Sequence, residues 1–193
     1  MAYNQPKFSP CDRWNPDAIT FANSSDSIVP NCYSIFIDSN NSIYATATDA
    51  TFVRIWINGG SSLTRNTSAG LTESFAVFTH SSGDIYVDSG GKNRTEKWSV
   101  NATSGVPVIF ANGGCHGLFI DIDDQIYCSC TDFHTVTKQS VHDAPSSWSN
   151  VAGNGTDGSG PYLLNKPIGI FVDTTLSVYI ADSANHRDRK SVV

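Results

Sequence analysis

Residues 170–179, Ile-Phe-Val-Asp-Thr-Thr-Leu-Ser-Val-Tyr, have a form that recurs through the chain. Three mainly apolar residues precede an aspartate, a short and mostly polar segment follows, and an apolar residue with a tyrosine ends the block. Two more copies end at Tyr44 and Tyr127, and a copy that ends at Tyr86 has His80 in place of the aspartate. The tyrosines are 42, 41 and 52 residues apart. A repeat of this length is typical of units built from about four short strands.

Each copy predicts a β-hairpin, because Asx, Ser and Gly between two apolar runs form turns. The first run of the hairpin is apolar at consecutive positions, as in residues 35–37, which is typical of a strand that is covered on both faces. An antiparallel sheet is covered in this way when it lies between two neighbouring sheets, as in a β-propeller. The units are predicted near residues 33–58, 75–100, 116–139 and 168–193.

The strands after each hairpin set the phase of the repeat. Trp56 and Trp98 lie twelve residues after their tyrosines and mark a third strand. Residues 108–112 predict an outer fourth strand, and residues 18–23 repeat that pattern near the N-terminus. We therefore expect an all-β fold of four-stranded antiparallel blades, in which the chain enters in the last strand of one blade.

The whole chain is predicted to form one domain, because repeats that contact only their neighbours have no sharp internal boundary. Blades are expected over residues 14–193, after a separate segment at residues 1–13. The long third interval is explained by a Gly-rich insertion at residues 153–161. A strand and not a helix is predicted after this insertion, so it is interpreted as an interblade loop and not as a phosphate-binding loop.

Composition and charge exclude several classes of protein. The 39% of hydrophobic residues favours a folded core over disorder, and the net charge of -6 argues against broad binding to nucleic acid or anionic membranes. No segment approaches the apolar length of a membrane span, and the first twenty residues lack the apolar segment of a signal peptide.

Five cysteines leave at least one thiol outside any internal pair. A bridge between Cys11 and Cys32 would join the N-terminal segment to the first unit. Cys115 precedes one strand of a hairpin and is expected to meet Cys128 or Cys130 on the other strand.

Six Asn-x-Ser/Thr sequons point to a secretory history, about twice the number expected by chance from this composition. They begin at Asn23, Asn40, Asn66, Asn93, Asn101 and Asn154. The sequons and the cysteine pairs together favour an extracellular or secretory location for the parent protein.

Metal and catalytic readings have little support in the sequence. A soft metal site could use Cys128 and Cys130 with His116 and His134, but Cys-x-Cys on a strand lacks the spacing of a zinc knuckle. Of the five histidines, only His134 and His186 share a position in the repeat, so no converging set of ligands is predicted. No catalytic, cofactor-binding or metal residue is assigned, and no cofactor is expected.

The acidic series at one end of the hairpins has two interpretations. Asp38, Asp121 and Asp173, with His80 in the second copy, lie where a propeller channel can bind a metal such as calcium. An aspartate at a strand end also accepts N–H bonds in the following turn, which every copy needs, and this role is favoured.

The aromatic series is expected to be structural in part. The four repeat tyrosines should pack between blades, since they are in register on the second strand. The tryptophans are placed on outer elements, where covering a blade edge is favoured over anchoring a partner; they are Trp14, Trp56, Trp98 and Trp148.

Residues 164–187, Leu-Asn-Lys-Pro-Ile-Gly-Ile-Phe-Val-Asp-Thr-Thr-Leu-Ser-Val-Tyr-Ile-Ala-Asp-Ser-Ala-Asn-His-Arg, resemble an NHL repeat, including its signature at Asn185-His186. The other copies resemble the family more loosely, and the resemblance covers residues 14–193. It implies a six-bladed β-propeller, usually a platform for protein, RNA or carbohydrate partners and only occasionally an enzyme. The chain has about four such blades, so we expect a fragment of a longer secreted-type NHL-repeat protein.

The favoured function is a noncatalytic interaction module that binds a protein or glycan partner through interstrand loops. One alternative is a propeller enzyme of the lyase or lactonase type with a channel metal. The other is a cytosolic NHL scaffold for RNA or ubiquitin-ligase complexes, against which the acidic charge and the sequons weigh. Uncovered blade faces at the two ends are expected to favour self-association.

Overall fold

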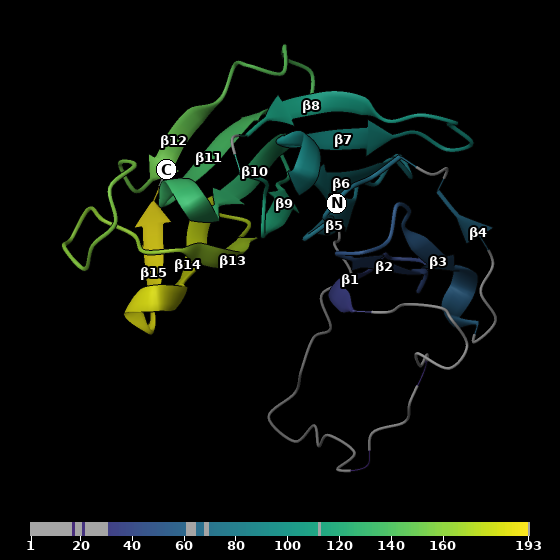
Figure 1. Ribbon diagram of the computed structural model, residues 1–193, viewed down its shortest axis with the longest axis horizontal. Coiled ribbons are helices and arrows are strands. Elements are labelled where there is room, and N and C mark those ends of the chain that lie inside the picture. Colours follow the sequence, from purple (N-terminus) through teal and green to yellow (C-terminus); the bar gives the residue numbers. More distant parts are fainter. Residues whose placement is uncertain are drawn as a thin grey trace.

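The computed structural model describes residues 17, 21, 31–60, 65–67, 70–111 and 113–192. Over these residues the chain forms four separate antiparallel sheets, which follow one another in chain order and fan out in an arc (Figure 1). The predicted all-β class is confirmed. No helix within the described ranges is long and apolar enough to cross a membrane. The predicted segment at 1–13 and most of the predicted strand at 18–23 lie outside the described residues.

The first two sheets each have four strands in simple up-and-down order. The first contains β1 (Cys32–Ile37), β2 (Ile43–Ala47), β3 (Arg54–Trp56) and β4 (Arg65–Asn66). The second contains β5 (Val77–Thr79), β6 (Ile85–Ser89), β7 (Arg94–Trp98) and β8 (Val106–Phe110). The repeat hairpins at the inner edge and the outer strand predicted at 108–112 are thus present, the latter shifted two residues towards the N-terminus.

The third and fourth sheets continue the same order along the chain. The third contains β9 (Leu118–Ile120), β10 (Gln125–Cys130), β11 (Thr135–Ser140) and β12 (Ser149–Ala152). The fourth has three strands, β13 (Pro167–Val172), β14 (Ser177–Asp182) and β15 (Arg187–Val192). We call the four sheets blades one to four.

A left-handed residue links the second and third strands of blades two, three and four. Each link is a short 3-10 turn: η3 (Gly90–Lys92), η4 (Thr131–Phe133) and η5 (Ser183–Asn185). The residue after each turn has a positive φ of 53°, 53° and 52° at Asn93, His134 and His186. Asn and His tolerate this conformation better than bulky or β-branched residues, so these positions reverse the chain at small cost. The shared position of His134 and His186 is therefore a turn position.

The innermost strands are joined by a continuous ladder of phenylalanine rings. Phe36 of β1 and Phe78 of β5 have ring centroids 4.5 Å apart. Phe78 is 5.1 Å from Phe119 of β9, which is 5.2 Å from Phe171 of β13. Tilted and edge-on ring pairs at these distances are favourable beyond the area that they bury. One phenylalanine per blade thus fixes the spacing of consecutive blades.

The core of the molecule lies between the blades. Tyr44 and Ile55 of blade one form a buried cluster with Ile85 and Trp98 of blade two. A larger cluster joins blades two, three and four. Trp56 and Trp98, expected on outer elements, end their third strands as buried side chains. Trp98 packs in the cluster between blades one and two, and the ring of Trp56 packs edge-on against Phe21 at 5.7 Å. Trp14 lies outside the described residues.

Candidate functional site

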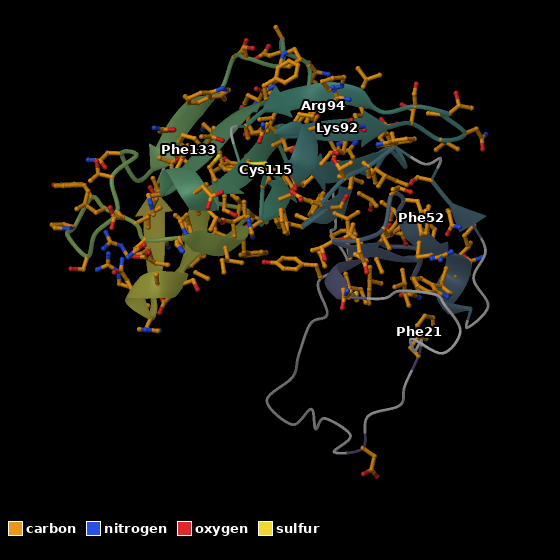
Figure 2. The ribbon with its side chains drawn as sticks, in the orientation of Figure 1. Phe21, Phe52, Lys92, Arg94, Cys115 and Phe133 are labelled. Carbon is orange, nitrogen blue, oxygen red and sulfur yellow. A yellow bond between two sulfur atoms is a disulfide. The ribbon has the colours of Figure 1, made fainter. Side chains whose placement is uncertain are left out.

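An aromatic cleft opens on the outer side of blades two and three. Phe110, Phe133 and Trp148 are all exposed and line a hollow of about 140 Å³, with Cys130 and Thr137 among its other lining residues. The three rings come from different places, since Phe110 ends β8, Phe133 ends η4 and Trp148 precedes β12. Figure 2 labels Phe133 at this edge of the structure. We refer to these three rings as the aromatic cleft.

Hydrogen bonds between blades hold the walls of the aromatic cleft in place. The backbone N–H of Phe110 donates to the carbonyl of Pro145 at 3.1 Å, which ties β8 to the turn before Trp148. The buried amide of Gln139 on β11 donates to the carbonyl of Val108 on β8 at 2.6 Å. Because both bonds cross from blade two to blade three, the rings are presented by a fixed framework.

The size of the aromatic cleft limits its occupant. Pockets for drug-sized ligands usually have about 300–1,000 Å³. The cleft, at about 140 Å³, is smaller than this range and is lined mainly by apolar atoms. A hollow of this kind suits a single apolar side chain that anchors a larger partner.

A larger and more polar pocket lies on the other side of β12, between β12 and β15. It has a volume of about 500 Å³ and is lined by Asn150, Asn154, Tyr162, Arg189 and Lys190, among others. Tyr162 is 84% exposed, so its ring is almost free of protein contacts. An amide, a guanidinium and an exposed ring around one hollow offer both hydrogen bonds and a stacking surface.

Residues 158–163, which include Tyr162 and span the end of the Gly-rich insertion, are anchored by the NHL-like signature. The guanidinium of Arg187 donates to the carbonyls of Ser159, Gly160 and Leu163 at 2.8, 3.4 and 3.1 Å. The side-chain amide of Asn185 donates to the carbonyl of Gly158 at 2.8 Å. Four carbonyls of residues 158–163 are therefore held by two side chains of blade four, which orders this end of the loop.

Asp182 is the buried acceptor that orients both anchoring side chains. Its carboxylate accepts bonds from Arg187 Nε at 2.7 Å, Asn185 Nδ2 at 2.9 Å and the backbone N–H of Asn165 at 2.6 Å. Burial acts to raise the pKa of Asp182, but these donors outweigh it and leave the pKa below its ordinary value. The carboxylate therefore stays ionised near neutral pH and keeps the guanidinium pointed at the insertion.

The acidic residues of the hairpins serve their turns. Asp38, Asp121 and Asp173 each accept two backbone N–H bonds through Oδ1, from the residues two and four positions later. Their Oδ2 atoms accept the hydroxyl of the repeat tyrosine, at 3.0 Å from Tyr44, 2.9 Å from Tyr127 and 3.1 Å from Tyr179. The tyrosine bond was not foreseen from the sequence, although the constant spacing of six residues is its signal.

His80 makes a contact between blades where the other copies have an aspartate. Its Nε2 is 2.9 Å from Oδ1 of Asp124 in blade three, and Nε2 of His142 is 3.2 Å from Oδ2 of the same carboxylate. The hydrogen bonds of both histidines to Asp124 lower the pKa of this aspartate. Within the part of the chain that the structure describes, no three His, Cys, Asp or Glu side chains gather as metal ligands.

A second aromatic group occupies the other end of the inner strands. Tyr33 of β1 donates or accepts a hydrogen bond of 3.0 Å with Nδ1 of His116, and the ring of Phe75 stacks on His116 with centroids 4.2 Å apart. Burial lowers the pKa of His116. These residues stand three positions before the ladder phenylalanines of their blades, so the repeat register, applied to this position, would have found them.

One of the two predicted cysteine pairs is present among the described residues. Cys115 and Cys128 form a disulfide, and the thiol of Cys130 lies 3.5 Å from the sulfur of Cys128. Figure 2 labels Cys115, where the yellow bond lies between blades two and three. Cys32 is an exposed free thiol in this structure, and Cys11 lies outside the described residues, so their pairing stays a prediction.

The sequon asparagines that the structure describes are all on the surface. They are Asn40, Asn66, Asn93, Asn101 and Asn154, whereas Asn23 lies outside the described residues. Asn154 borders the polar pocket, and its Oδ1 accepts the N–H of Thr156 at 3.0 Å. Attachment of a glycan at Asn154 would therefore cover one side of that pocket.

Comparison with known proteins supports the fold alone. No family model matches the sequence, and no curated protein matches it. A Bacteroides thetaiotaomicron protein of unknown function superposes with a TM-score of 0.68 at 12% identity, covering 86% of this chain and 50% of that one. A streptogramin B lyase superposes with a TM-score of 0.62 at 13% identity, covering 83% of this chain and 54% of that one. An auxiliary nutrient binding protein from B. thetaiotaomicron superposes with a TM-score of 0.61 at 16% identity, covering 79% of this chain and 45% of that one.

The chain thus spans about half the length of each of these three solved structures. At these identities the likeness says nothing of a shared activity. Together with the four fanned antiparallel sheets, it shows that the chain folds as blades of a β-propeller.

Proposed function

We propose that this chain is a noncatalytic interaction module that binds a protein partner through the aromatic cleft. The observation that carries the proposal is the convergence of Phe110, Phe133 and Trp148 on one apolar hollow at the outer surface. Aromatic residues are enriched at the centres of protein interfaces, and a few of them supply most of the binding free energy. The fixed framework of blades two and three lowers the entropic cost of binding.

We further propose that the parent protein is an extracellular propeller of the NHL type. The disulfide between Cys115 and Cys128 is of a kind that persists in oxidising compartments. The exposed sequon asparagines agree with passage through the secretory pathway. The NHL assignment rests on Asp182, Asn185 and Arg187, which act together as the anchor of the insertion.

The proposal is tested by selecting ligands from a displayed library of peptides on the purified chain. The expected binders carry one large apolar side chain, and their binding changes the fluorescence of Trp148, the only exposed tryptophan among the described residues. Substitution Phe133→Ser is expected to weaken binding by at least about tenfold, because interface aromatics commonly contribute more than about 1 kcal/mol.

Tyr162→Ala is the matched control, since it removes an exposed ring that lies outside the aromatic cleft. It should leave peptide binding unchanged. Selected peptides without an apolar anchor, or peptides whose affinity is indifferent to Phe133→Ser, would contradict a cleft that acts as a side-chain pocket.

The polar pocket supports a second candidate, the binding of a glycan. Its volume of about 500 Å³ lies within the usual range for ligand sites, and Tyr162 offers a flat ring beside the donors of Arg189 and Asn150. Screening on an array of oligosaccharides tests this function. Tyr162→Ala should abolish the signal and Phe133→Ser should preserve it, which reverses the pattern expected for peptides. A signal unaffected by Tyr162→Ala would exclude the pocket.

A further inference from the structure

Each blade has two chemically different faces. The forward face carries the ladder phenylalanine and the repeat tyrosine, which are cross-strand partners, as in the pair Phe78 and Tyr86. The back face carries the residues on either side of the phenylalanine, such as Val77 and Thr79, because side chains alternate across a strand. We use these two names for all four blades.

The three contacts between consecutive blades all join a forward face to a back face. Tyr44 and Ile55 on the forward face of blade one pack with Val77 and Ile85 on the back face of blade two. Phe78 on blade two and Leu118 on blade three belong to the same buried cluster. That cluster also joins the forward face of blade three to the back face of blade four, through Tyr127 and Val172.

The forward face of blade four has the same composition but is open. Phe171 and Tyr179 are 38% and 36% exposed, whereas Phe78 and Tyr86 are 3% and 1% exposed at the same positions of blade two. The ammonium group of Lys190 lies 5.1 Å from the Tyr179 ring, as Lys97 and Lys138 lie 5.9 Å from their tyrosines. The face is therefore built as an interblade surface.

The back face of blade one is open at its inner end. Ile35 and Ile37 of β1 are 63% and 43% exposed. Val77 and Ile120, which stand at the matching positions of blades two and three, are 4% and 0% exposed. Further out on the same face, Trp56 is already buried against Phe21. The exposed part of this face is therefore the innermost strand, at Ile35 and Ile37, where the ladder phenylalanine of a preceding blade would pack.

We propose that two copies of this chain associate head to tail, with the forward face of blade four in one copy packed on the back face of blade one in the other. The contact would repeat the three contacts that the chain already makes internally. Phe171 would extend the ladder onto a second copy's Phe36, between Ile35 and Ile37. The proposal rests on other residues than the aromatic cleft, and it shares only Lys190 with the polar pocket.

Closure of the ring favours two copies over more. A head-to-tail contact makes either a closed ring or an open filament. The described residues form four blades, which in Figure 1 occupy only part of a circle, with blades one and four at the two ends of the arc. Propellers have about 4–8 blades, so two copies reach the upper limit and three copies would exceed it.

The test is sedimentation of the 193-residue chain at micromolar concentration, alone and as single-site variants. The unaltered chain is expected to sediment as a discrete pair of chains. Phe171→Asp and Ile35→Asp should each weaken association by at least about 30-fold, since each places a charge at the centre of an apolar interface. Val106→Asp is the matched control, because Val106 on β8 is 63% exposed, as Ile35 is, but lies on neither open face.

A mixture of the two variants identifies the geometry. Each variant retains one intact face, so an equal mixture of Phe171→Asp and Ile35→Asp should recover a mixed dimer through one unaltered contact. Circular dichroism and thermal unfolding of each variant confirm that both altered residues, which are exposed, leave the blades folded.

Four outcomes would overturn the proposal. A monomer at all concentrations would show that another occupant, such as further blades of a longer polypeptide, covers these faces. Association that persists in both variants, or that the mixture does not restore, would exclude the head-to-tail contact. Species that grow beyond two chains would exclude the closed ring.

Discussion

The hydroxyl of Tyr127 donates a hydrogen bond of 2.9 Å to Oδ2 of Asp121, and both side chains are buried between blades. The bond joins the start of the hairpin turn to the second strand of the blade. Tyr179 makes the equivalent bond of 3.1 Å to Asp173, but on the open face of blade four. The same bond therefore occurs in this chain once in a buried setting and once in an exposed one.

We expect Tyr127→Phe to lower the free energy of unfolding by about 2 kcal/mol, because a hydrogen bond to a buried charged group is worth about 1.5–3 kcal/mol. Tyr179→Phe, the matched control, should lower it by less than about 1 kcal/mol, since water replaces the lost hydroxyl. Urea denaturation of the two variants measures both values. Equal losses would mean that the burial of Asp121 is not what gives the bond its strength.

The blades could be predicted from the sequence because their pattern is local. An apolar run, a turn aspartate and a tyrosine lie within ten residues, so hairpins at Asp38, Asp121 and Asp173 follow from turn chemistry alone. The buried positions of Trp56 and Trp98 could not be predicted in the same way. Their burial depends on contacts outside their own blade, with blade one for Trp98 and with Phe21 for Trp56, and no pattern within one repeat describes these contacts.

The aromatic cleft could not be predicted from the sequence. Phe110, Phe133 and Trp148 belong to two blades and to three kinds of element, and nothing in their spacing brings them together. The pattern at 153–161 predicts a loop, and Asn185 belongs to the NHL-like signature. That Arg187 holds this loop follows only from the three-dimensional position of its guanidinium beside the carbonyls.

Removing the guanidinium of Arg187, which donates to three carbonyls, should make the insertion more mobile. Lysine keeps the charge but cannot reach several carbonyls at once, so Arg187→Lys is expected to increase the rate of chymotrypsin cleavage after Tyr162 by about tenfold. Arg189→Lys is the matched control on the same strand, because Arg189 donates to the single carbonyl of Pro161 in the insertion. Mass spectrometry of the first cleavage products measures both rates. Equal rates for the two variants would show that the guanidinium of Arg187 does not order the loop.

Asp88 should make stability depend on pH. Burial raises its pKa from 3.8 to about 7, an effect that the N–H of Cys115, at 2.7 Å from Oδ1, offsets only in part. The folded state therefore binds more protons than the unfolded state between these two values. The contribution of Asp88 to stability is full below about pH 3.8, decreases as pH rises and is lost above about pH 7.

We expect Asp88→Asn to raise the free energy of unfolding at pH 8 by on the order of 2 kcal/mol and to change it little at pH 4. Asp84→Asn is the control of opposite sign. The pKa of Asp84 is lowered, since hydrogen bonds that include the one from Lys97 at 2.8 Å outweigh its burial, so its loss should destabilise the chain at pH 8. Urea denaturation at pH 4 and pH 8 measures the change in the free energy of unfolding for each of the two variants. An Asp88→Asn variant less stable than the unaltered chain at pH 8 would mean that the carboxylate is tolerated in its buried position.

The three sulfur atoms between blades two and three should differ sharply in reactivity. Burial raises the pKa of the Cys130 thiol, and a buried, protonated thiol is a poor nucleophile even at 3.5 Å from Cys128. Alkylation without denaturant is therefore expected to spare Cys130, which should react only after unfolding. Peptide mass mapping under acidic conditions, which suppress thiol exchange, should find Cys115 joined to Cys128. A Cys115–Cys130 peptide in that map, or rapid labelling of Cys130, would show that the third thiol exchanges with the disulfide in the folded chain.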